Sequence, residues 1–533
     1  MGLLLFTSCI SKVLDQSGIK FHSDPKISRS TPWHLQKRIP DSTASIDFVD
    51  VGRFLKKIEP ATVIVAVLDT PMEISHDSLK DHIWVNQDEI PGNQIDDDNN
   101  GYVDDINGWN YIANLNDDHN LYVNLESTRI LKSIGVTRLN ESIILPNYKD
   151  PIRAKYYQTV LAHYKERKAN LLRLKKNYER LDRYYYGVME EVQPYFNDRE
   201  ITLKAIDSLE KAKSADIDSL NFVALREFEK YNINSRYVDS LRNHYTQLHD
   251  LLTDLDYNDR QIQGDDANNL NDRTYGSPKI NVHTDLLDHA NPVAGIILGL
   301  NHGNSIKLMS LATSCYGDEN DKDIALAIRY AVDNGAKVIN MSFWKHFSLH
   351  QNWVHDAIKY AAEKDVLIIS IAGNDGLNIQ DFPKYPNDTD QNGREITDNF
   401  MLIGASNRYV NHEPLVDFSN YGKIDVDLFA PGIDIYTAGS NNTMIEDFDG
   451  TSAAAPIVSG VAALIRSYYP SLTAPEVKHI LMESGVTYTV KVPTPTETDP
   501  EKTTPFNELS KSGKILNAHN AIKMADRLMS TRQ

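Results

Sequence analysis

Apolar segments of strand length recur along this chain, and helical patterns separate them. The segment 61–68 is apolar without polar alternation, and further apolar segments follow at 306–312, 336–342 and 366–371. A strand of this kind is buried on both faces, as in a parallel sheet. Helical patterns at 323–334 and 352–363 alternate with the strands and can cover the sheet. The sequence therefore predicts an α/β fold in three layers, with a mainly parallel sheet between helices.

The composition narrows the class of protein. A chain of 533 residues is too long for one compact core, which predicts two domains. The hydrophobic fraction of 41% and the charged fraction of 24% are those of a globular protein. The formal net charge of −19 argues against a nucleic acid as partner, because nucleic acids bind basic patches. An acidic balance suits an extracytoplasmic protein, a Ca²⁺-binding protein or plain solubility, and charge alone does not separate these.

The chain has two cysteines, too few for a disulfide scaffold. Cys9 ends an apolar run that is similar to a bacterial lipoprotein signal but is short and lacks a basic start. Either the start codon is misplaced or this is a chance apolar N-terminus. The lipoprotein interpretation makes residues 1–9 a signal and predicts an extracytoplasmic protein, secreted or anchored to a membrane of the cell envelope through lipidated Cys9. Cys315 is then expected to be a small buried hydrophobe.

The region 113–264 differs from the rest because its apolar residues follow a seven-residue repeat. One heptad position holds Tyr157, Tyr164, Leu171, Tyr178 and Tyr185, and the other holds Val160, Leu174, Leu181 and Val188. A second run holds Val238, Leu241, Tyr245, Leu248, Leu252 and Leu255. Two such seams with charged flanks predict an inserted α-helical domain, a coiled-coil-like antiparallel hairpin. Binding of a protein partner, shielding of a cleft and spacing are open roles for it.

Three polar residues stand at the ends of predicted elements. Asp69 directly follows the strand 61–68, where open α/β sheets place their chemistry. His289 opens an apolar helix, because Pro292 fits only in a first turn. Ser452 lies in a small-residue turn before the last long apolar helix, where free N–H groups suit a nucleophile whose attack creates an oxyanion. The alternatives are capping roles for Asp69 and Ser452 and a structural or exposed His289.

An acidic loop follows the first strand. Its candidate Ca²⁺ ligands are Asp96, Asp98, Asn100, Tyr102, Asp104 and Asp105. Their spacing, with a turn glycine at 101, matches the first nine positions of a Ca²⁺ loop, but Asn107 stands where the final glutamate is expected. Neighbouring carboxylates repel one another unless a cation or water separates them. The two interpretations are a structural Ca²⁺ site and a solvated acidic turn.

Together these residues resemble the subtilisin family of serine proteases. The chain order Asp69, His289, Ser452 is that of subtilisins, and Asn374, after Ala372-Gly373, matches the family's oxyanion asparagine. Further segments similar to the family's are 335–342, 418–422 and 426–432.

The resemblance covers 46–112 and 265–533, which it makes the two parts of a catalytic domain. Residues 10–45 form an N-terminal segment, and 113–264 is the insertion. The acidic loop and the insertion are similar to those of a bacterial, lipoprotein-type branch of the family.

The resemblance implies a serine endopeptidase that acts on a polypeptide. Ser452 would attack the peptide carbonyl while His289 takes its proton, and Asp69 would orient and stabilise the imidazole. Asn374 and the backbone N–H of Ser452 would hold the oxyanion. The substrate-binding positions that it implies are Ser342, Phe343, Trp344, Ile371, Ala372 and Gly373.

Three positions depart from the family pattern. Ala290 to Pro292 follow His289 where the family has Gly-Thr-His, and Thr70-Pro71 follow Asp69 where the family has a glycine two residues on. Trp344 replaces a glycine that leaves room for the substrate, so its indole would narrow or fill that space. The alternatives to an active enzyme are a pseudoprotease kept as a binding scaffold and a lipoprotein adhesin that works through the insertion. The insertion is also a candidate regulator of activity.

Overall fold

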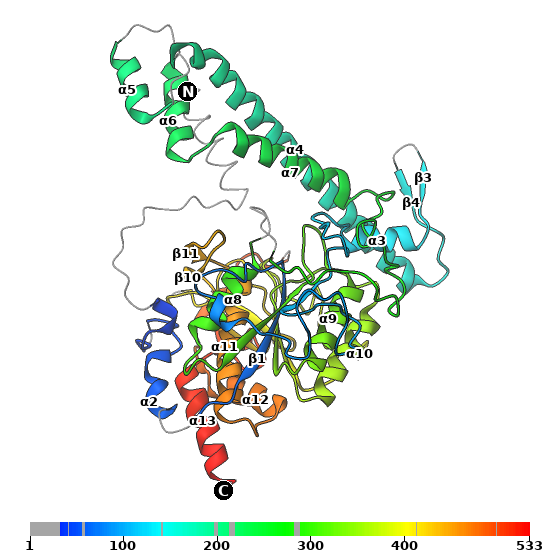
Figure 1. The fold of residues 1–533 in the computed structure, drawn as a ribbon, viewed down its shortest axis with the longest axis vertical. Coiled ribbons are helices and arrows are strands. Elements are labelled where there is room, and N and C mark those ends of the chain that lie inside the picture. The colour runs from blue at the N-terminus through cyan, green and yellow to red at the C-terminus, as the bar shows by residue number, and fades with distance from the viewer. Residues whose placement is uncertain are drawn as a thin grey trace. The chain divides into compact units, whose positions relative to one another are not determined.

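A computed structural model describes residues 32–40, 42–55, 59–139, 142–196, 201–212, 219–281, 288–411, 413–496 and 498–532 (Figure 1). The described residues fall into two compact units, one within Leu131–Tyr257 and the other within Arg29–Ile130 and Asn258–Gln533. We name the first the helical unit and the second the sheet unit. Cys9 lies outside the described residues.

The sheet unit is built on nine strands in the order β12-β15-β9-β8-β7-β6-β1-β5-β2. Their bounds are β1 (Val63–Asp69), β2 (Gly108–Asn110), β5 (Ile306–Ala312), β6 (Val338–Met341), β7 (Leu367–Ile371), β8 (Phe400–Ser406), β9 (Leu428–Pro431), β12 (Val486–Thr487) and β15 (Lys514–Ile515). Neighbouring strands are parallel, except that β12 and β15 are antiparallel. The predicted α/β fold with a mainly parallel sheet is confirmed.

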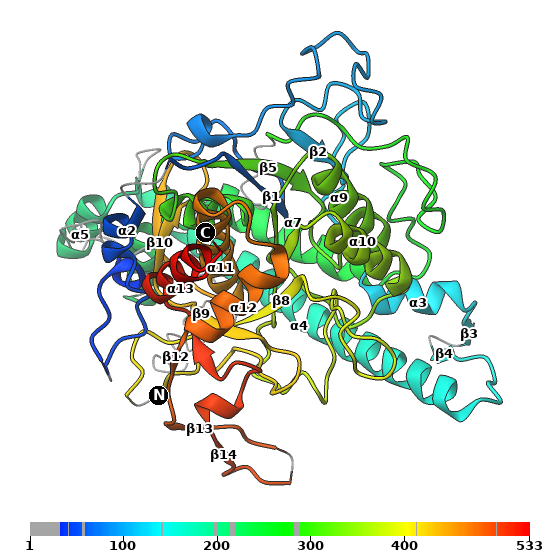
Figure 2. The same ribbon diagram turned by 90° about the horizontal axis from the view of Figure 1, so that it is seen from below.

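Helices cover both faces of this sheet (Figure 2). α8 (Ala290–Gly299) and α11 (Thr451–Tyr468) lie on one face, and α9 (Asp321–Asp333) and α10 (Gln351–Glu363) lie on the other. Every residue of β6, β7, β8 and α11 is buried. The apolar strands therefore lack polar alternation because neither of their faces meets water.

Smaller elements complete the sheet unit. They are α2 (Gly52–Leu55), α12 (Ala474–Ser484), α13 (Ala518–Ser530), the hairpins β10 (Ile435–Ala438) with β11 (Met444–Phe448) and β13 (Lys491–Pro493) with β14 (Thr503–Pro505), and short 3-10 helices at Trp33–Leu35, Phe48–Asp50, Lys80–His82 and Phe506–Glu508. α3 (Glu126–Ser133) crosses the division between the two units. No helix in the described part of the chain has both the length and the apolar character of a membrane span.

The helical unit contains the predicted helical hairpin. Its elements are β3 (Thr137–Leu139), β4 (Ser142–Ile144), α4 (Pro151–Phe196), α5 (Leu203–Ala212), α6 (Ser219–Lys230) and α7 (Ser235–Leu252). Near the start of α4, the Tyr164 hydroxyl donates to the carbonyl of Thr253 at 2.7 Å. Farther along α4, the ring of Tyr178 stacks on that of Tyr245 at 3.8 Å. The contacts run in opposite directions along α4 and α7, so these two helices are antiparallel.

The structure adds two features to the predicted hairpin. The heptad pattern does not predict α5 and α6. These helices pack on the far end of α4 around Val192, Phe196, Ile206 and Phe228. The helical unit also spans fewer residues than the predicted insertion of 113–264, because the residues at both ends of that insertion belong to the sheet unit.

The residues that flank the helical unit form buried ion pairs. Arg129 Nε donates to Asp259 Oδ2 at 2.8 Å, and Arg129 Nη1 donates to Glu126 Oε2 at 2.9 Å. Lys345 Nζ donates to the other oxygen of Glu126 at 3.1 Å. These four side chains are at most 8% exposed. Polar residues at the two ends of the insertion are therefore part of the interior of the sheet unit.

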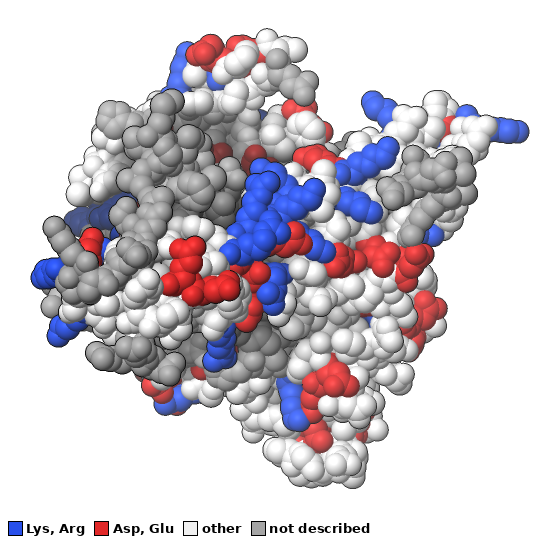
Figure 3. Space-filling model, turned by 90° about the horizontal axis from the view of Figure 1, so that it is seen from above, with Lys and Arg blue, Asp and Glu red and all other residues white. Residues whose placement is uncertain are grey.

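Acidic and basic side chains lie next to one another on the face drawn in Figure 3. Although the whole chain has a net charge of −19, the acidic side chains on that face do not form one continuous patch.

Gly460 lies where α11 packs against α8. A Cβ atom at this position would stand 2.6 Å from Leu300 Cδ1 and 3.2 Å from the carbonyl oxygen of Ile297. Only a residue without a side chain allows the two helices this spacing, and the same helices carry His289 and Ser452 at their starts.

We predict that Gly460→Ala lowers the free energy of unfolding by about 1–3 kcal/mol, the usual cost of overpacking a core. This loss should appear although alanine favours a helix by about 1 kcal/mol. Gly299→Ala, in α8, is the matched control, because nothing lies within 4 Å of a Cβ atom there. Urea denaturation measures both variants, and a Gly460→Ala protein as stable as the wild type would contradict the prediction.

Candidate active site

Asp69 is the last residue of β1, which lies between β5 and β6. Its carboxylate is buried, and its Oδ1 accepts a hydrogen bond from the backbone N–H of Thr70 at 2.7 Å. The carboxyl ends of parallel strands meet at one edge of a sheet. Ser342, just after β6, and Asn374, shortly after β7, therefore belong to the same edge as Asp69.

His289 is the N-cap residue of α8 and is paired with Asp69. Its Nδ1 lies 2.8 Å from Asp69 Oδ1 and 3.0 Å from Oδ2. The backbone N–H of Ala290 donates to the Thr70 hydroxyl at 3.0 Å, which ties the start of α8 to the end of β1. A carboxylate beside Nδ1 favours the tautomer with the proton on that nitrogen. The other ring nitrogen, Nε2, is then the basic one.

Electrostatics favour the charged form of His289. Burial lowers the pKa of its imidazole, but the charge of Asp69 and its hydrogen bond outweigh burial and raise the pKa above the ordinary value of 6.5. The side chain of His289 is 33% exposed, whereas that of Asp69 is 2% exposed. The pair therefore combines a buried, fixed carboxylate with an imidazole that solvent can reach.

Ser452 is the second residue of α11. Its hydroxyl donates to the carbonyl oxygen of Ser342 at 3.2 Å, and the hydroxyl of Ser342 donates to the carbonyl of Ser452 at 3.3 Å. This reciprocal pair fixes the start of α11 against the end of β6. The hydrogen bond of the Ser452 hydroxyl thus runs to Ser342 and not to His289 in this structure.

Asn374 is held beside Ser452 by Thr451. Asn374 Oδ1 accepts from the backbone N–H of Thr451 at 3.0 Å and from its hydroxyl at 2.7 Å. A Cβ atom built on Gly450 would lie 3.5 Å from Asn374 Nδ2 and 3.7 Å from Ser452 Cβ. With its oxygen occupied, the asparagine side chain presents its N–H₂ group near Ser452, and Gly450 keeps the space between them open.

The six predicted substrate-binding residues form two strand-end segments. Ser342 and Phe343 are buried, Trp344 is half-buried, and Ile371 to Gly373 precede Asn374. The indole of Trp344 lies against Gly373, because a Cβ atom there would be 3.2 Å from Trp344 Cδ2. The two segments are therefore in direct contact through Trp344.

The acidic loop gathers only some of its predicted ligands. One carboxylate oxygen from each of Glu89, Asp96 and Asp98 lies within 4.8 Å of the other two. Asp105 is fully buried, and its carboxylate accepts hydrogen bonds from Asn100 at 2.9 Å and from the Tyr330 hydroxyl at 2.5 Å. Burial raises the pKa of Glu89 and that of Asp105. Carboxylates held this close offer oxygen ligands to a divalent cation.

Asn100 adjoins this cluster, since its Nδ2 donates to Asp98 Oδ2 at 3.0 Å, and two other predicted ligands make further contacts. The Asp104 carboxylate accepts from the backbone N–H groups of Asn93 and Gln94. The ring of Tyr102 packs edge-on against Trp109 at 5.0 Å. The spacing of the Ca²⁺ loop did not predict Glu89 as a member of the cluster, because Glu89 precedes the loop and has no position in its pattern.

Comparison with known proteins places the chain in a family. The sequence model of peptidase S8, the subtilase family, matches residues 61–508. The chain belongs to the subtilase family. A thermophilic serine proteinase of Bacillus sp. (strain AK1) is 34% identical over 34% of this chain and 43% of its own length. The cell wall-associated protease of Bacillus subtilis (strain 168) is 33% identical over 37% of this chain and 21% of its own length.

This subtilase thus spans about half or less of the first curated relatives that it matches. Among solved structures, a lanthipeptide protease aligns with a TM-score of 0.36 at 23% identity, over 46% of this chain and 77% of that chain.

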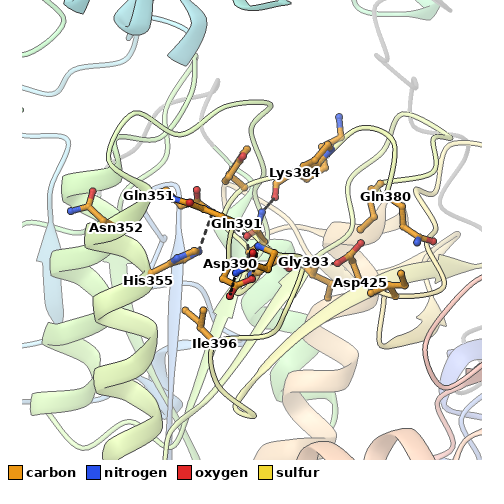
Figure 4. A pocket seen from close by; sticks show the side chains of 18 of the residues that line it. Gln351, Asn352, His355, Gln380, Lys384, Asp390, Gln391, Gly393, Ile396 and Asp425 are labelled. Atoms are coloured by element: carbon orange, nitrogen blue, oxygen red, sulfur yellow. Dashed lines mark hydrogen bonds between the residues drawn. The ribbon is translucent and has the colours of Figure 1, made fainter. Parts of the chain in front are cut away.

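The subtilase also has a cavity of 770 Å³ between the start of α10 and the loops around 380 and 390 (Figure 4). Its lining includes the amide side chains of Gln351, Asn352, Gln380, Asn387, Gln391 and Asn392. Gln351 and His355 form a hydrogen bond of 3.0 Å across one side of it. Lys384 also lines the cavity, and its ammonium group lies 4.2 Å from the ring centroid of Trp344. The cavity is therefore connected through Lys384 to Trp344.

We predict that the His289 ring titrates above pH 6.5 and that Asp69→Asn lowers this midpoint, because burial alone disfavours the imidazolium. A raised folded-state pKa means that His289 stabilises the fold below the unfolded pKa of about 6.5, and that this contribution is lost as the pH rises through the folded-state pKa. NMR of the histidine ring protons measures the midpoint. The midpoints of other histidines serve as controls. An unchanged His289 midpoint in Asp69→Asn would refute the conclusion that Asp69 raises the pKa of His289.

Proposed function

We propose that this subtilase is a serine endopeptidase with Asp69, His289 and Ser452 as its catalytic triad and Asn374 as an oxyanion donor. The observation that carries the proposal is the bond of the His289 Nδ1 to both carboxylate oxygens of Asp69, at the sheet edge that also carries Ser452. A buried carboxylate, a partly exposed imidazole and a serine at a helix start are the parts that acyl transfer needs. The family match over 61–508 supports the same reaction.

The first chemical step follows from these positions. The Ser452 hydroxyl turns from the Ser342 carbonyl to His289 Nε2 and gives up its proton as its oxygen bonds to the substrate carbonyl carbon. The carbonyl oxygen becomes an oxyanion that the N–H₂ group of Asn374 and the backbone N–H of Ser452 stabilise. The imidazolium is stabilised by Asp69 and passes the proton to the leaving amine as the C–N bond breaks.

The second step hydrolyses the acyl-enzyme. A water molecule gives a proton to His289 Nε2 and attacks the ester carbonyl, and the ester bond to Ser452 then breaks. The proton returns to the Ser452 oxygen, which restores the enzyme and releases the carboxylic acid product.

We predict that a fluorophosphonate probe labels the purified wild-type protein and fails to label Ser452→Ala, because only an activated serine displaces fluoride at a useful rate. Ser467→Ala is the matched control: it removes a serine from the other end of α11, where the hydroxyl donates to the carbonyl of Ala61 at 2.7 Å. In-gel fluorescence measures the labelling. A folded wild-type protein that takes no label would contradict the proposal and would favour a binding scaffold.

We also propose that the acidic loop holds a structural Ca²⁺ ion through Glu89, Asp96 and Asp98. The support is the gathering of their oxygens within 4.8 Å, a distance at which carboxylates repel one another strongly. N–H groups already offset part of this repulsion, since Asp96 accepts from the backbone N–H of Asn100 at 3.0 Å and from that of Gly101 at 2.9 Å. A solvated acidic turn is the alternative that a measurement has to exclude.

We predict that Ca²⁺ raises the stability of the wild-type protein by about 2.7 kcal/mol at a concentration 100 times the Kd, and that the double variant Asp96→Asn/Asp98→Asn loses this gain. Asp118→Asn, in a neighbouring acidic turn outside the cluster, should keep it. Thermal unfolding with Ca²⁺ and with a chelator measures the effect. Equal unfolding temperatures in the two conditions would leave the solvated turn as the correct interpretation.

Two further roles stay predictions. We propose an extracytoplasmic location with anchoring through Cys9, on the strength of the apolar run that ends at this residue and the acidic composition. Retention of a Cys9→Ser variant in the membrane fraction would argue against anchoring.

Recognition of a protein partner by the helical unit is proposed on its separate compact structure alone, and a pull-down with and without this unit tests it.

A further inference from the structure

The triad geometry determines where the residue before the scissile bond must lie. The carbonyl under attack has to meet the Ser452 oxygen while its own oxygen points to Asn374. The Ser452 hydroxyl rests on the carbonyl of Ser342, and Asn374 directly follows Gly373. The residue that carries this carbonyl therefore lies beside the segment after Ser342 and the segment before Asn374.

Trp344 fills the space between these two segments. A Cβ atom built on Gly373 would lie 3.2 Å from Trp344 Cδ2 and 3.3 Å from Trp344 Cε2, the two atoms that fuse the rings of the indole. The indole thus lies directly against the backbone of Gly373. No room for a second ring or a branched side chain is left along this line of contact.

Lys384 holds the indole through a cation–π contact. Its Nζ lies 4.2 Å from the ring centroid of Trp344 and 2.7 Å from Asp375 Oδ2, and its side chain is 1% exposed. Asp375 is itself fixed, because its Oδ2 accepts from Asn420 Nδ2 at 3.3 Å. A cation over an indole attracts the ring, and more strongly when water is excluded. The ring of His346 also packs edge-on against Trp344 at 4.8 Å.

The same contacts exclude a different role for Lys384. A lysine near a substrate pocket can bind an acidic side chain, but this ammonium group is almost fully buried and already pairs with Asp375. An incoming carboxylate would have to displace both the indole and Asp375. Lys384 therefore acts on specificity by positioning Trp344.

We infer that Trp344, fixed by Lys384 and Asp375, limits this subtilase to cleavage after residues with small side chains, namely glycine, alanine and serine. This inference rests on the proposed endopeptidase function. Trp344 is the specificity-determining residue, and Lys384 is a positioning residue.

The test compares peptide p-nitroanilides that differ only in the residue before the scissile bond, alanine or phenylalanine. We expect kcat/KM for alanine to exceed that for phenylalanine by roughly 100-fold in the wild type, the discrimination that a pocket's shape commonly provides. Trp344→Gly should reverse the ratio, because it removes the indole that contacts both Gly373 and Lys384. Lys384→Met, which keeps the stem but frees the indole, should relax the ratio by a smaller factor.

Two controls keep the result interpretable. Trp353→Ala removes an indole that stacks on His350 at 3.9 Å, outside both substrate segments, and should keep the wild-type ratio. Circular dichroism melts establish that each variant is folded, and Trp344→Ala replaces Trp344→Gly if the glycine variant does not fold.

A small fluorophosphonate that carries no peptide separates this inference from the proposed function. If it labels the wild type and the ratio is the same in the wild type and Trp344→Gly, the specificity inference is wrong and the endopeptidase proposal stands. If it labels Trp344→Gly but not the wild type, Trp344 closes the site altogether, and the inference is overturned as well. If neither protein is labelled, the proposed function fails, and the inference fails with it.

Discussion

Burial of both faces of the central sheet determines where the polar groups of the active site can stand. β6, β7 and β8 are buried throughout, so a side chain that meets a substrate has to follow a strand end. Asp69, Ser342 and Asn374 stand at the ends of three successive strands. α8 and α11 start at that edge and bring His289 and Ser452 to it. Each element of the proposed chemistry thus depends on the parallel direction of the strands.

The fold and the polar residues of the site could be predicted because both follow from short stretches of sequence. Asp69 is recognisable as the end of an apolar strand and Ser452 as the start of an apolar helix, and in the structure β1 ends at Asp69 and α11 starts at Thr451. Contacts between distant loops could not be predicted. Lys384 gives no sign of its place beside Trp344, and Glu89 gives none of its place beside Asp96, because neither pair lies in one periodic element. The direction of the Asp104 carboxylate depends likewise on the path of its own loop.

The two ion pairs near the site show how exposure decides what a charge does. The Asp69–His289 pair leaves the imidazole 33% exposed, so this group can gain and lose a proton. In the Asp375–Lys384 pair the lysine is 1% exposed and lies against an indole, and burial lowers its pKa while Asp375 opposes that shift. The first pair is suited to proton transfer. The second is a fixed support, because breaking it would leave a charge buried without a partner.

The ion pair between Arg129 and Asp259 has a consequence for how this chain tolerates change in length. It joins, at 2.8 Å, the residues on either side of the helical unit, so the sheet unit itself closes the base of this long excursion. Loop-closure entropy grows by only about 0.6 kcal/mol for each doubling of loop length. Once the two ends are joined, the number of residues between them scarcely affects the stability of the sheet. The stretch between Arg129 and Asp259 is therefore a place where helices can be gained, lost or exchanged over evolutionary time while the triad keeps its geometry.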